Sequence, residues 1–266
     1  MAKQIVDLPS GAWSVEDRGE GRVILLVHGF PLDHSMWRRQ IESLSRRFRV
    51  IAPDLIGFGQ SGPVESFSMA SLADGLASLL DELRIAEKIC YCGLSMGGYV
   101  GWEFWARHAG RLDRFIACDT RALPDSAEAA DGRKKLAEKV RAEGSAPVVA
   151  AMLPKLFGPK AQTTIGADFE ATNAVMSGTR PETLIAALMA MAARRDFSAE
   201  LPNIAVRSLI VCGENDAIVP VKEMREIAAA MPDAKFAPID GVGHMSPLEA
   251  PLAFDIQINE FLENWR

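Results

Sequence analysis

A serine held between two glycines constrains the fold of this chain most. Residues 88–92 form an apolar, strand-like run and residues 99–107 form a helix-like run, with the pattern G-x-S-x-G between them. A serine at this junction lies on a tight, strained turn. Bulky side chains two positions before or after Ser95 would clash, which explains Gly93 and Gly97. Because the following helix directs its N–H groups and positive end toward the turn, the pattern predicts a nucleophilic serine.

Apolar runs that are typical of buried strands alternate with helix-like segments along most of the chain. Such alternation predicts an α/β protein with a mostly parallel central sheet, flanked by helices. The N-terminal residues 4–18 predict one or two hairpins at a sheet edge. The other expected strands are residues 23–27, 49–52, 88–92, 112–118, 206–212 and 234–239, and the expected helices of this layered core are residues 36–48, 68–83, 99–107, 221–231 and 251–265.

The alternation is interrupted between residues 122 and 196, where no convincing strand is visible. Helical patterns are expected instead at residues 126–143, 147–157, 169–176 and 181–194. A segment of this length is too long for an ordinary connection between a strand and the next helix. The sequence therefore predicts a core domain formed by residues 1–121 and 197–266, with residues 122–196 inserted as a helical cap, or lid.

A nucleophilic serine needs a base, and the base needs an acid that orients it. In an architecture with this strand–turn–helix elbow, the three residues follow one another as serine, acid and histidine. The chain has four histidines, His28, His34, His108 and His244, and only His244 follows a further candidate acid after Ser95. The glycine-rich segment around His244 would let its loop return to the sheet edge, which makes His244 the predicted base.

The predicted acid is Asp216, in the loop after the strand expected at residues 206–212. Its carboxylate would fix the tautomer of the imidazole and stabilise the imidazolium. Asp119 is an alternative acid, since it directly follows the strand that ends at residue 118. Asp54 also ends a strand, but we interpret it as the residue that ties down the glycine-rich loop behind it.

An oxyanion that forms on a substrate carbonyl needs preorganised hydrogen-bond donors. The residue after the nucleophile provides one, the backbone N–H of Met96. The second is expected from the loop after the strand at residues 23–27, where we assign the backbone N–H of Phe30. His28 precedes both Ser95 and Asp216 in the chain, so we expect it to be structural.

Several of these motifs together resemble one large family. They occur in the order His28-Gly29-Phe30-Pro31, Asp54 with Gly57-Phe58-Gly59-Gln60-Ser61, Gly93-Leu94-Ser95-Met96-Gly97-Gly98, the segment from Gly213 to Asp216, and Gly243-His244. This set is similar to the α/β-hydrolase superfamily, and most similar to its capped bacterial serine carboxylesterases, with enol-lactonases and cofactor-free perhydrolases close by. The resemblance implies the α/β-hydrolase fold with a cap. It also implies ester hydrolysis through an acyl-enzyme on Ser95, without a cofactor or metal.

Two features of the sequence disfavour particular groups within this superfamily. The chain has no His-Gly-Gly-Gly segment, which disfavours the lipase group that carries it. Serine at the elbow disfavours the haloalkane dehalogenases and epoxide hydrolases, which use aspartate there. A lactonase, a perhydrolase, and a binding or receptor protein that keeps the triad but turns over slowly remain as alternatives to an esterase.

The predicted cap carries apolar side chains that could form an acyl pocket, among them Met152, Leu156 and Met189. A small apolar pocket predicts short, uncharged acyl esters as substrates. Arg121 offers an alternative, because its guanidinium could bind the carboxylate of a lactone substrate. It could equally pair with Asp119 or with an acid of the cap.

The composition limits the partners and the compartment. With 266 residues, 48% hydrophobic residues, a net charge of −6 and a pI near 5.4, the chain suits one large domain and argues against nucleic acid or anionic membrane as partners. No signal segment or membrane-spanning run is visible, and the four cysteines fall in expected buried strands without metal spacing. We expect a cytoplasmic protein with reduced cysteines, a small ester and water as its substrates, and a monomer or small homo-oligomer.

Overall fold

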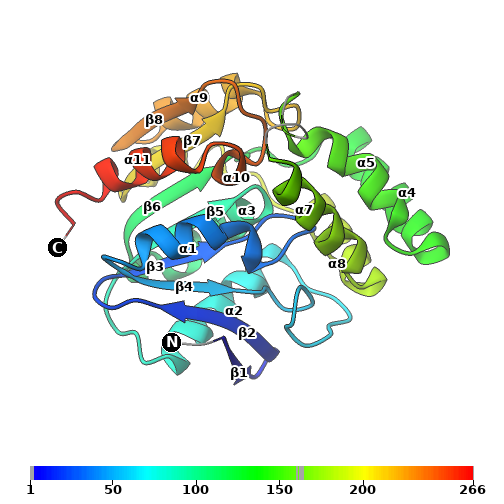
Figure 1. Cartoon of the computed structure of the whole chain (residues 1–266), viewed down its shortest axis with the longest axis horizontal. Helices are drawn as coiled ribbons and strands as arrows, with labels where there is room; N and C mark the ends of the chain where they lie inside the picture. Colours follow the sequence, from blue (N-terminus) through cyan, green and yellow to red (C-terminus); the bar gives the residue numbers. More distant parts are fainter. Residues whose placement is uncertain (1–2, 160, 162–164, 266) are drawn as a thin grey trace.

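The computed structural model describes residues 3–159, 161 and 165–265 and contains one eight-stranded sheet (Figure 1). The strand order is β1-β2-β4-β3-β5-β6-β7-β8. The first three strands in this order pair antiparallel, and every later pair is parallel, which confirms the predicted mostly parallel sheet with a hairpin at its edge. The strands are β1 (Gln4–Leu8), β2 (Gly11–Arg18), β3 (Val23–Val27), β4 (Arg49–Pro53), β5 (Ile89–Leu94), β6 (Leu112–Cys118), β7 (Arg207–Gly213) and β8 (Ala234–Ile239).

Helices cover both faces of this sheet, because the central strands are apolar on both sides. In β3, Leu25 belongs to the core under α2 (Met69–Glu82), α3 (Met96–His108) and α9 (Val221–Ala230). Its neighbours in the strand, Ile24 and Leu26, belong to the opposite core, under α1 (Arg38–Leu44) and α11 (Pro251–Phe261). Successive side chains of a strand point to opposite faces, so an uninterrupted apolar run is what a doubly covered strand requires.

The described residues between β6 and β7 form helices and no strand. These helices are α4 (Ala127–Glu143), α5 (Ala146–Leu156), α7 (Gly166–Gly178) and α8 (Pro181–Ala192), and they lie together at one end of the sheet (Figure 1). Of the segment expected as a cap, positions 160 and 162–164 lie outside the described residues, as do positions 1–2 and 266 of the expected core. Its treatment as a separate cap domain stays a prediction. The short helices are η1 (His34–Trp37), η2 (Ala109–Arg111), η3 (Leu201–Asn203) and α10 (Ser246–Glu249).

Polar contacts attach the inserted helices to the loop after β4 and to the helix α1, which follows β3. The guanidinium of Arg180, just before α8, donates to the carbonyl oxygens of Gly57 (2.5 Å) and Ser61 (2.7 Å). Asp168 of α7 forms ion pairs with Arg38 and Arg39 of α1. The inserted helices therefore lie over the edge of the sheet to which the carboxyl ends of the parallel strands point.

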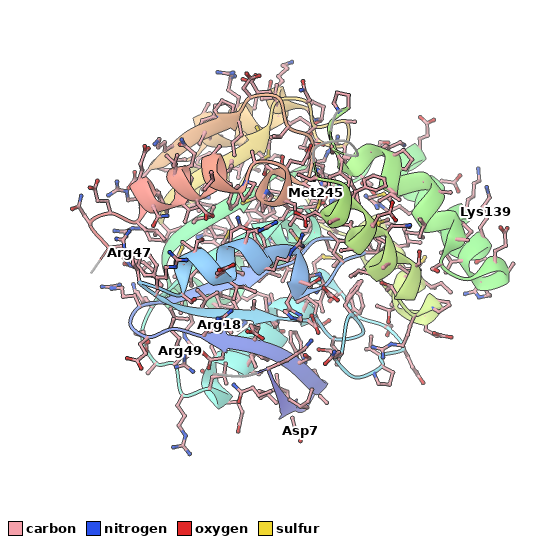
Figure 2. The ribbon with its side chains drawn as sticks, in the orientation of Figure 1. Asp7, Arg18, Arg47, Arg49, Lys139 and Met245 are labelled. Carbon is pink, nitrogen blue, oxygen red and sulfur yellow. The ribbon has the colours of Figure 1, made fainter. Side chains whose placement is uncertain are left out.

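The outer surface is charged and the sheet interior is apolar. Figure 2 shows Lys139 on α4 and Arg47 near α1 pointing outward, and both are exposed. All four cysteines are buried and none forms a disulfide. None of the helices in the described part of the chain has the length and apolarity needed to span a bilayer.

Candidate active site

Ser95 occupies a strained turn between β5 and α3. Its backbone has φ 53° and ψ −112°, outside the regions that non-glycine residues usually adopt. A β-carbon on Gly93 would collide with the carbonyl group of Gly97, and one on Gly97 would collide with the carbonyl oxygen of Val27. The two flanking glycines are therefore required by close backbone contacts, as the motif predicts.

The backbone of Ser95 is held from the neighbouring strand β6. Its N–H donates to the carbonyl oxygen of Cys118 (2.9 Å), and its own carbonyl oxygen accepts from the hydroxyl of Thr120 (2.8 Å). Sequence reasoning overlooked Thr120. Gly98 leaves room for this threonine, because a β-carbon on Gly98 would collide with the Thr120 side chain.

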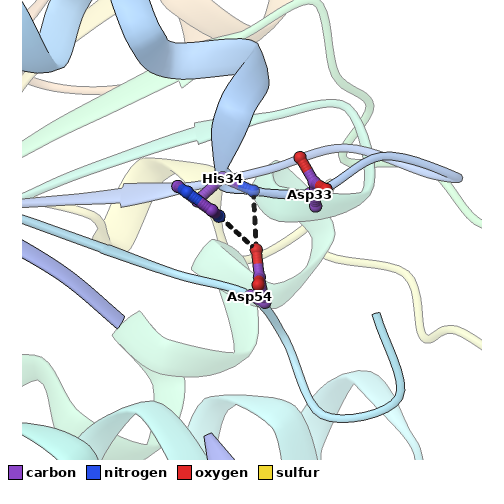
Figure 3. Close-up of side chains that lie close together, drawn as sticks. All are labelled: Asp33, His34 and Asp54. Atoms are coloured by element: carbon purple, nitrogen blue, oxygen red, sulfur yellow. Dashed lines mark hydrogen bonds and ion pairs between the residues drawn. The ribbon is translucent and has the colours of Figure 1, made fainter. Parts of the chain in front are cut away.

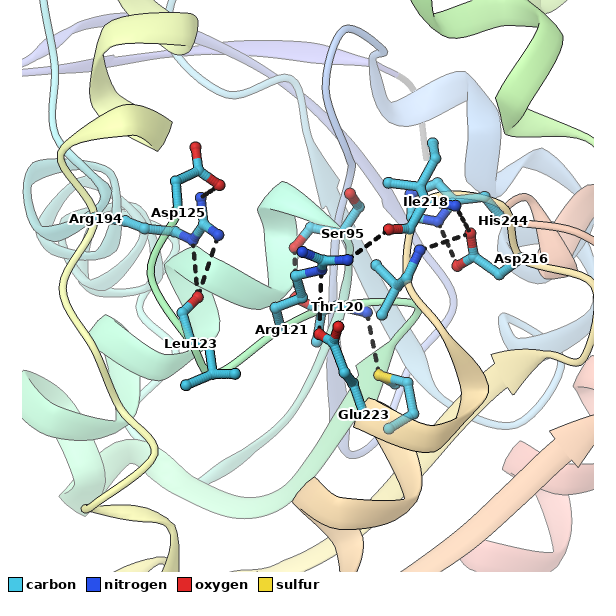
Figure 4. Close-up of polar contacts among 12 residues, drawn as sticks. Ser95, Thr120, Arg121, Leu123, Asp125, Arg194, Asp216, Ile218, Glu223 and His244 are labelled. Atoms are coloured by element: carbon cyan, nitrogen blue, oxygen red, sulfur yellow. Dashed lines mark hydrogen bonds and ion pairs between the residues drawn. The ribbon is translucent and has the colours of Figure 1, made fainter. Parts of the chain in front are cut away.

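His244 and Asp216 form a buried pair (Figure 4). The Nδ1 atom of His244 lies 2.7 Å from Oδ2 of Asp216, and the two side chains are 1% and 0% exposed. The other carboxylate oxygen of Asp216 accepts from the backbone N–H groups of Ile218 (2.7 Å) and Val219 (3.0 Å). When Nδ1 donates to Asp216, Nε2 is left with a lone pair that can take a proton.

Asp119 hydrogen bonds to other groups. One of its carboxyl oxygens accepts from the N–H of Gly213 and the other from the hydroxyl of Ser246, each at 2.8 Å. Both neighbours of Asp119 in the chain, Cys118 and Thr120, contact the backbone of Ser95. A carboxyl oxygen of Asp119 also lies within 4.8 Å of carboxyl and imidazole atoms of the buried pair. The segment 118–120 therefore connects the serine turn to the acid–histidine pair.

The loop that precedes α1 approaches the serine from another side. A β-carbon on Gly29 would lie 3.4 Å from the β-carbon of Ser95, so Phe30 follows directly on this contact. The N–H of Met96 is the first of α3 and has no acceptor within the helix. These two amides have the local positions expected of oxyanion donors, and their role stays a prediction.

His28 supports that loop and does not belong to the buried pair. Its Nδ1 lies 2.9 Å from the carbonyl oxygen of Gly29, and its Nε2 accepts from the N–H of Leu55 (3.0 Å). Complete burial lowers the pKa of His28, which favours the neutral ring that these two bonds require. The expected structural role of His28 is consistent with this geometry.

Asp54 connects two loops at the same edge of the sheet (Figure 3). Its carboxylate accepts from the N–H of Gln60 (2.9 Å), which confirms that it ties down the glycine-rich loop. It also accepts from the N–H of His34 (2.9 Å) and contacts Nδ1 of the same residue at 2.5 Å. Burial raises the pKa of Asp54, but the bonds and charge of His34 and the amide of Gln60 outweigh it, and the pKa is lowered. The bond to His34 was not predicted.

The three residues expected to line an acyl pocket differ in how deeply they are buried. Leu156 is 1% exposed, and its carbonyl oxygen accepts from the N–H of Met245, next to His244 (3.0 Å). Met152 is partly buried between the two cores, whereas Met189 is 44% exposed on α8. An exposed side chain does not line an enclosed pocket, so this position gives Met189 no support.

Arg121 is paired, but with neither of the partners expected from the sequence. Its guanidinium donates to the carbonyl oxygen of Ile218 (2.8 Å), and its Nε lies 3.2 Å from a carboxylate oxygen of Glu223 on α9 (Figure 4). The expected partners were Asp119 or an acid of the inserted helices. No sequence pattern pointed to Glu223, because α9 follows β7 and lies far from Arg121 along the chain.

Two clusters bring a histidine and two acids within 4.8 Å of one another in the described part of the chain. They contain Asp33, His34 and Asp54, and Asp119, Asp216 and His244. In both clusters the imidazole already contacts a carboxylate directly, at 2.5 and 2.7 Å. We interpret them as hydrogen-bonded networks, in which an acid orients a ring.

The comparisons with known proteins agree with this architecture. The structure is similar to a thermophilic esterase from Thermogutta terrifontis, solved with malate bound, with a TM-score of 0.96, 38% identity, and 99% of each chain covered. It is also similar to an enol-lactonase from Burkholderia xenovorans LB400, with a TM-score of 0.91, 29% identity, and 98% and 100% of the two chains covered. By sequence it is 28% identical over 235 residues to 3-oxoadipate enol-lactonase 1 of Acinetobacter baylyi, covering 88% of this chain and 86% of that protein.

The family model of the alpha/beta hydrolase fold matches residues 22–251, which include the serine turn, the acid and the histidine. This range covers most of the chain, and the order of its motifs is the one that the resemblance implied. The chain belongs to the α/β-hydrolase family.

Proposed function

We propose that the chain is a serine hydrolase that cleaves carboxylic esters. In this proposal Ser95 is the nucleophile, His244 the general base and Asp216 the acid that orients it. The observation that carries the proposal is the buried bond of 2.7 Å between His244 and Asp216, linked through residues 118–120 to the strained turn of Ser95. His34 also contacts a buried carboxylate, that of Asp54, but the pair of His244 and Asp216 is the one that residues 118–120 link to the serine turn.

The reaction would proceed in two halves. The Oγ atom of Ser95 attacks the ester carbonyl carbon while its proton moves to Nε2 of His244. The carbonyl electrons move to oxygen, and the N–H groups of Phe30 and Met96 donate to this oxyanion. The tetrahedral intermediate collapses, and the alcohol leaves with the proton from His244. Water then attacks the acyl-enzyme with His244 as base, which releases the acid and restores Ser95.

Esters with short, uncharged acyl groups are the substrates that we propose for this site. Leu156 is apolar and buried, and its backbone is bonded to the residue after His244. It therefore lies beside the loop that carries the proposed base, the base loop at residues 240–245. Arg121, the cation considered for binding a substrate carboxylate, is already paired with Glu223 and the carbonyl oxygen of Ile218. An anionic substrate would have to replace both of these bonds. The likeness at 38% identity to a thermophilic esterase supports ester hydrolysis as the reaction.

A lactonase is the second candidate, favoured by two enol-lactonases to which the chain is 28% and 29% identical. A lactone is an internal ester, so attack by Ser95 would be the same step, with the leaving alcohol still attached to the acyl group. A perhydrolase would replace water by peroxide in the second half. A receptor on this fold would form the acyl-enzyme and release it very slowly.

A labelling experiment combined with a substrate panel tests the proposal. A serine-directed organophosphonate should form one adduct at Ser95, and Ser95→Ala should lose both labelling and turnover. The exposed Ser66 provides a matched control, and Ser66→Ala should retain both. Losing the nucleophile typically removes several orders of magnitude of rate. An adduct at another residue, or near-normal turnover of Ser95→Ala, would contradict the proposal.

The panel should contain p-nitrophenyl esters of increasing acyl length, uncharged lactones, and anionic lactones derived from dicarboxylic acids. Short, uncharged esters should have the highest kcat/KM. If an anionic lactone is the best substrate, the lactonase assignment replaces the esterase. Stoichiometric release of p-nitrophenol without further turnover would favour the receptor.

A further inference from the structure

A second buried carboxyl group, that of Asp119, lies close to the proposed acid Asp216. Asp119 directly follows β6, is 0% exposed and has a positive φ of 46°, which is uncommon for a residue other than glycine. Its N–H donates to the carbonyl oxygen of Val211 (3.0 Å), and its carboxyl oxygens accept from Gly213 and Ser246. These three bonds hold the side chain of Asp119 in one place, between the loops that carry Asp216 and His244.

No lysine or arginine in the described part of the chain balances a second negative charge beside Asp216. A carboxyl oxygen of Asp119 lies within 4.8 Å of a carboxyl oxygen of Asp216 and a ring nitrogen of His244. Within the described residues, neither a lysine nor an arginine forms a hydrogen bond or ion pair with Asp119. Two adjacent buried carboxyl groups cannot both ionise readily, so one of them keeps its proton.

The bonds that each carboxyl group forms indicate which one is protonated. Asp216 accepts from two backbone amides and faces the imidazole. Asp119 accepts from one amide and one hydroxyl. Burial and then the charge of Asp216 raise the pKa of Asp119 well above its usual value. The bonds and the direction of this shift therefore place the shared proton on Asp119.

We propose that Asp119 is a positioning residue that, as a neutral carboxylic acid, donates its O–H to the carboxylate of Asp216 and so holds that carboxylate toward His244. This inference rests on the proposed function, because it assigns a role beside the proposed triad. An ionised carboxylate has about four lone-pair sites, so Asp216 can accept this bond together with those from Ile218, Val219 and His244. Asp119 transfers no proton to the substrate.

The proposal predicts a change at alkaline pH. When Asp119 loses its proton, the donor bond becomes a repulsion between two carboxylates, and Asp216 is no longer held toward the ring. The titratable groups that face Asp119 are Asp216, His244 and the thiols of Cys118 and Cys212. Burial raises the pKa of both thiols, which favours their neutral forms. The proposal therefore expects activity to fall at alkaline pH as Asp119 loses its proton.

Two variants of Asp119 test whether its hydrogen-bond donor is needed. Asp119→Asn keeps a neutral N–H donor of the same shape, whereas Asp119→Ala removes it. At neutral pH the asparagine variant should keep kcat within a few-fold of wild type, and the alanine variant should lose about 10- to 100-fold in kcat with little change in KM. Between about pH 6 and pH 11, the alkaline decrease of kcat should move upward or disappear in the asparagine variant. Equal losses in both variants with unchanged circular dichroism, or identical alkaline profiles of wild type and Asp119→Asn, would overturn the proposal.

An infrared measurement tests the protonation state without any turnover. The C=O stretch of a protonated carboxyl group should be present in the wild-type protein at neutral pH, shift in D₂O, and be missing from the spectrum of Asp119→Asn. Asp216→Asn, which removes the neighbouring charge that raises the pKa of Asp119, should weaken this band. Absence of an Asp119 band at neutral pH would overturn the proposal even if every variant is active. Conversely, a protein whose Ser95 is neither labelled nor needed for turnover would refute the proposed function, while the band would still report the proton on Asp119.

Discussion

Gly213, at the end of β7, lies so close to Gly243 that a β-carbon on Gly213 would collide with the carbonyl oxygen of Gly243. Beside this contact, the N–H of Asn215 donates to the carbonyl oxygen of Val242 (2.8 Å). The two loops are therefore pressed together backbone to backbone. This contact brings Asp216 and His244, 28 residues apart in the chain, within hydrogen-bond distance.

The first prediction concerns this contact. Gly213→Ala should separate the two loops and lower kcat by about 100-fold, because a displacement of about 1 Å in a catalytic group has an effect of that size. Gly132→Ala is the matched control. Gly132 lies in α4, where a β-carbon would meet open space, so alanine there should leave kcat unchanged and raise helix stability by about 0.5–1 kcal/mol. Steady-state kinetics and thermal unfolding measure both effects, and an active Gly213→Ala would contradict the role of the contact.

The second prediction separates the two candidate acids. Asp216→Asn should lower kcat about ten-thousandfold, the loss known for a triad aspartate, while KM and circular dichroism stay nearly unchanged. The reason is that the amide oxygen of asparagine would accept from the N–H groups of Ile218 and Val219, so that its NH₂ group faces Nδ1 of His244 and favours the wrong tautomer. Asp119→Asn should have a far smaller effect at neutral pH. The opposite order of losses, in two folded variants, would move the acid to Asp119.

The third prediction concerns Glu249, which joins the inserted helices to the base loop. One carboxylate oxygen accepts from the N–H of Gly158 (2.7 Å) and the other from the N–H of Gly243 (2.9 Å). Glu249→Ala leaves both amides without this acceptor, so the unfolding free energy should fall by about 1–3 kcal/mol and kcat should fall with it. Glu249→Gln keeps one acceptor oxygen and should recover part of both. If denaturant titration and kinetics show no loss in the alanine variant, the carboxylate does not couple these segments.

The fourth prediction is a pH dependence of stability at Asp54. Its pKa is lower in the folded chain than the usual 3.8 because the bonds of His34 and Gln60 outweigh burial. The unfolded chain therefore takes up more protons as the pH falls, and the stabilisation from Asp54 is present at neutral pH and lost below about pH 4. Asp54→Asn should reduce the unfolding free energy by about 1–3 kcal/mol at neutral pH and by less in acid.

Urea titrations of both proteins at several pH values measure this difference. The control is Asp7→Asn, since Asp7 is exposed on β1 (Figure 2), and it should change the unfolding free energy by less than about 0.5 kcal/mol. A destabilisation of Asp54→Asn that stays constant down to about pH 3 would show that ionisation of Asp54 is not its cause.

The fifth prediction concerns Arg121 and charged substrates. Because its guanidinium is paired with Glu223 and Ile218, Arg121→Ala should change stability by up to about 1 kcal/mol and leave the ratio of kcat/KM for charged and uncharged substrates unchanged. The exposed Arg46→Ala is a control for the loss of a positive charge. A selective increase in KM for an anionic lactone in Arg121→Ala would instead support the lactonase.

Elements with a strong local pattern were predicted closely. The strands at residues 112–118 and 234–239 have the expected bounds, and the expected strand at 206–212 is shifted by one residue. The helix expected at 36–48 is instead a 3-10 turn at His34–Trp37 followed by α1 at Arg38–Leu44, because Asp33 caps the chain earlier and the last turn leaves the helix at Ser45. The helix α10 was missed, since four residues carry too little periodicity to be recognised.

Contacts between distant segments were not visible in the sequence. The hydroxyl of Thr120 on the carbonyl oxygen of Ser95, the pairing of His34 with Asp54, and Glu249 on Gly158 each join residues separated by other elements. No local pattern marks such a bond, because its partners are brought together by the packing of strands and helices. Only the family motifs indicated which distant residues would act together, and they did so for Ser95, Asp216 and His244.

The sequence by itself determined the layered fold and the strained serine turn, because apolar periodicity and the spacing of Gly93 and Gly97 act over a few residues. It also restricted the base to His244 by the order of residues along the chain. The tertiary structure decided that Asp216, and not Asp119, hydrogen bonds with that histidine, and that Arg121 is paired with Glu223. The physical reason is that these choices depend on which loops meet at the carboxyl ends of neighbouring strands, and close backbone contacts such as that of Gly213 with Gly243 set this meeting.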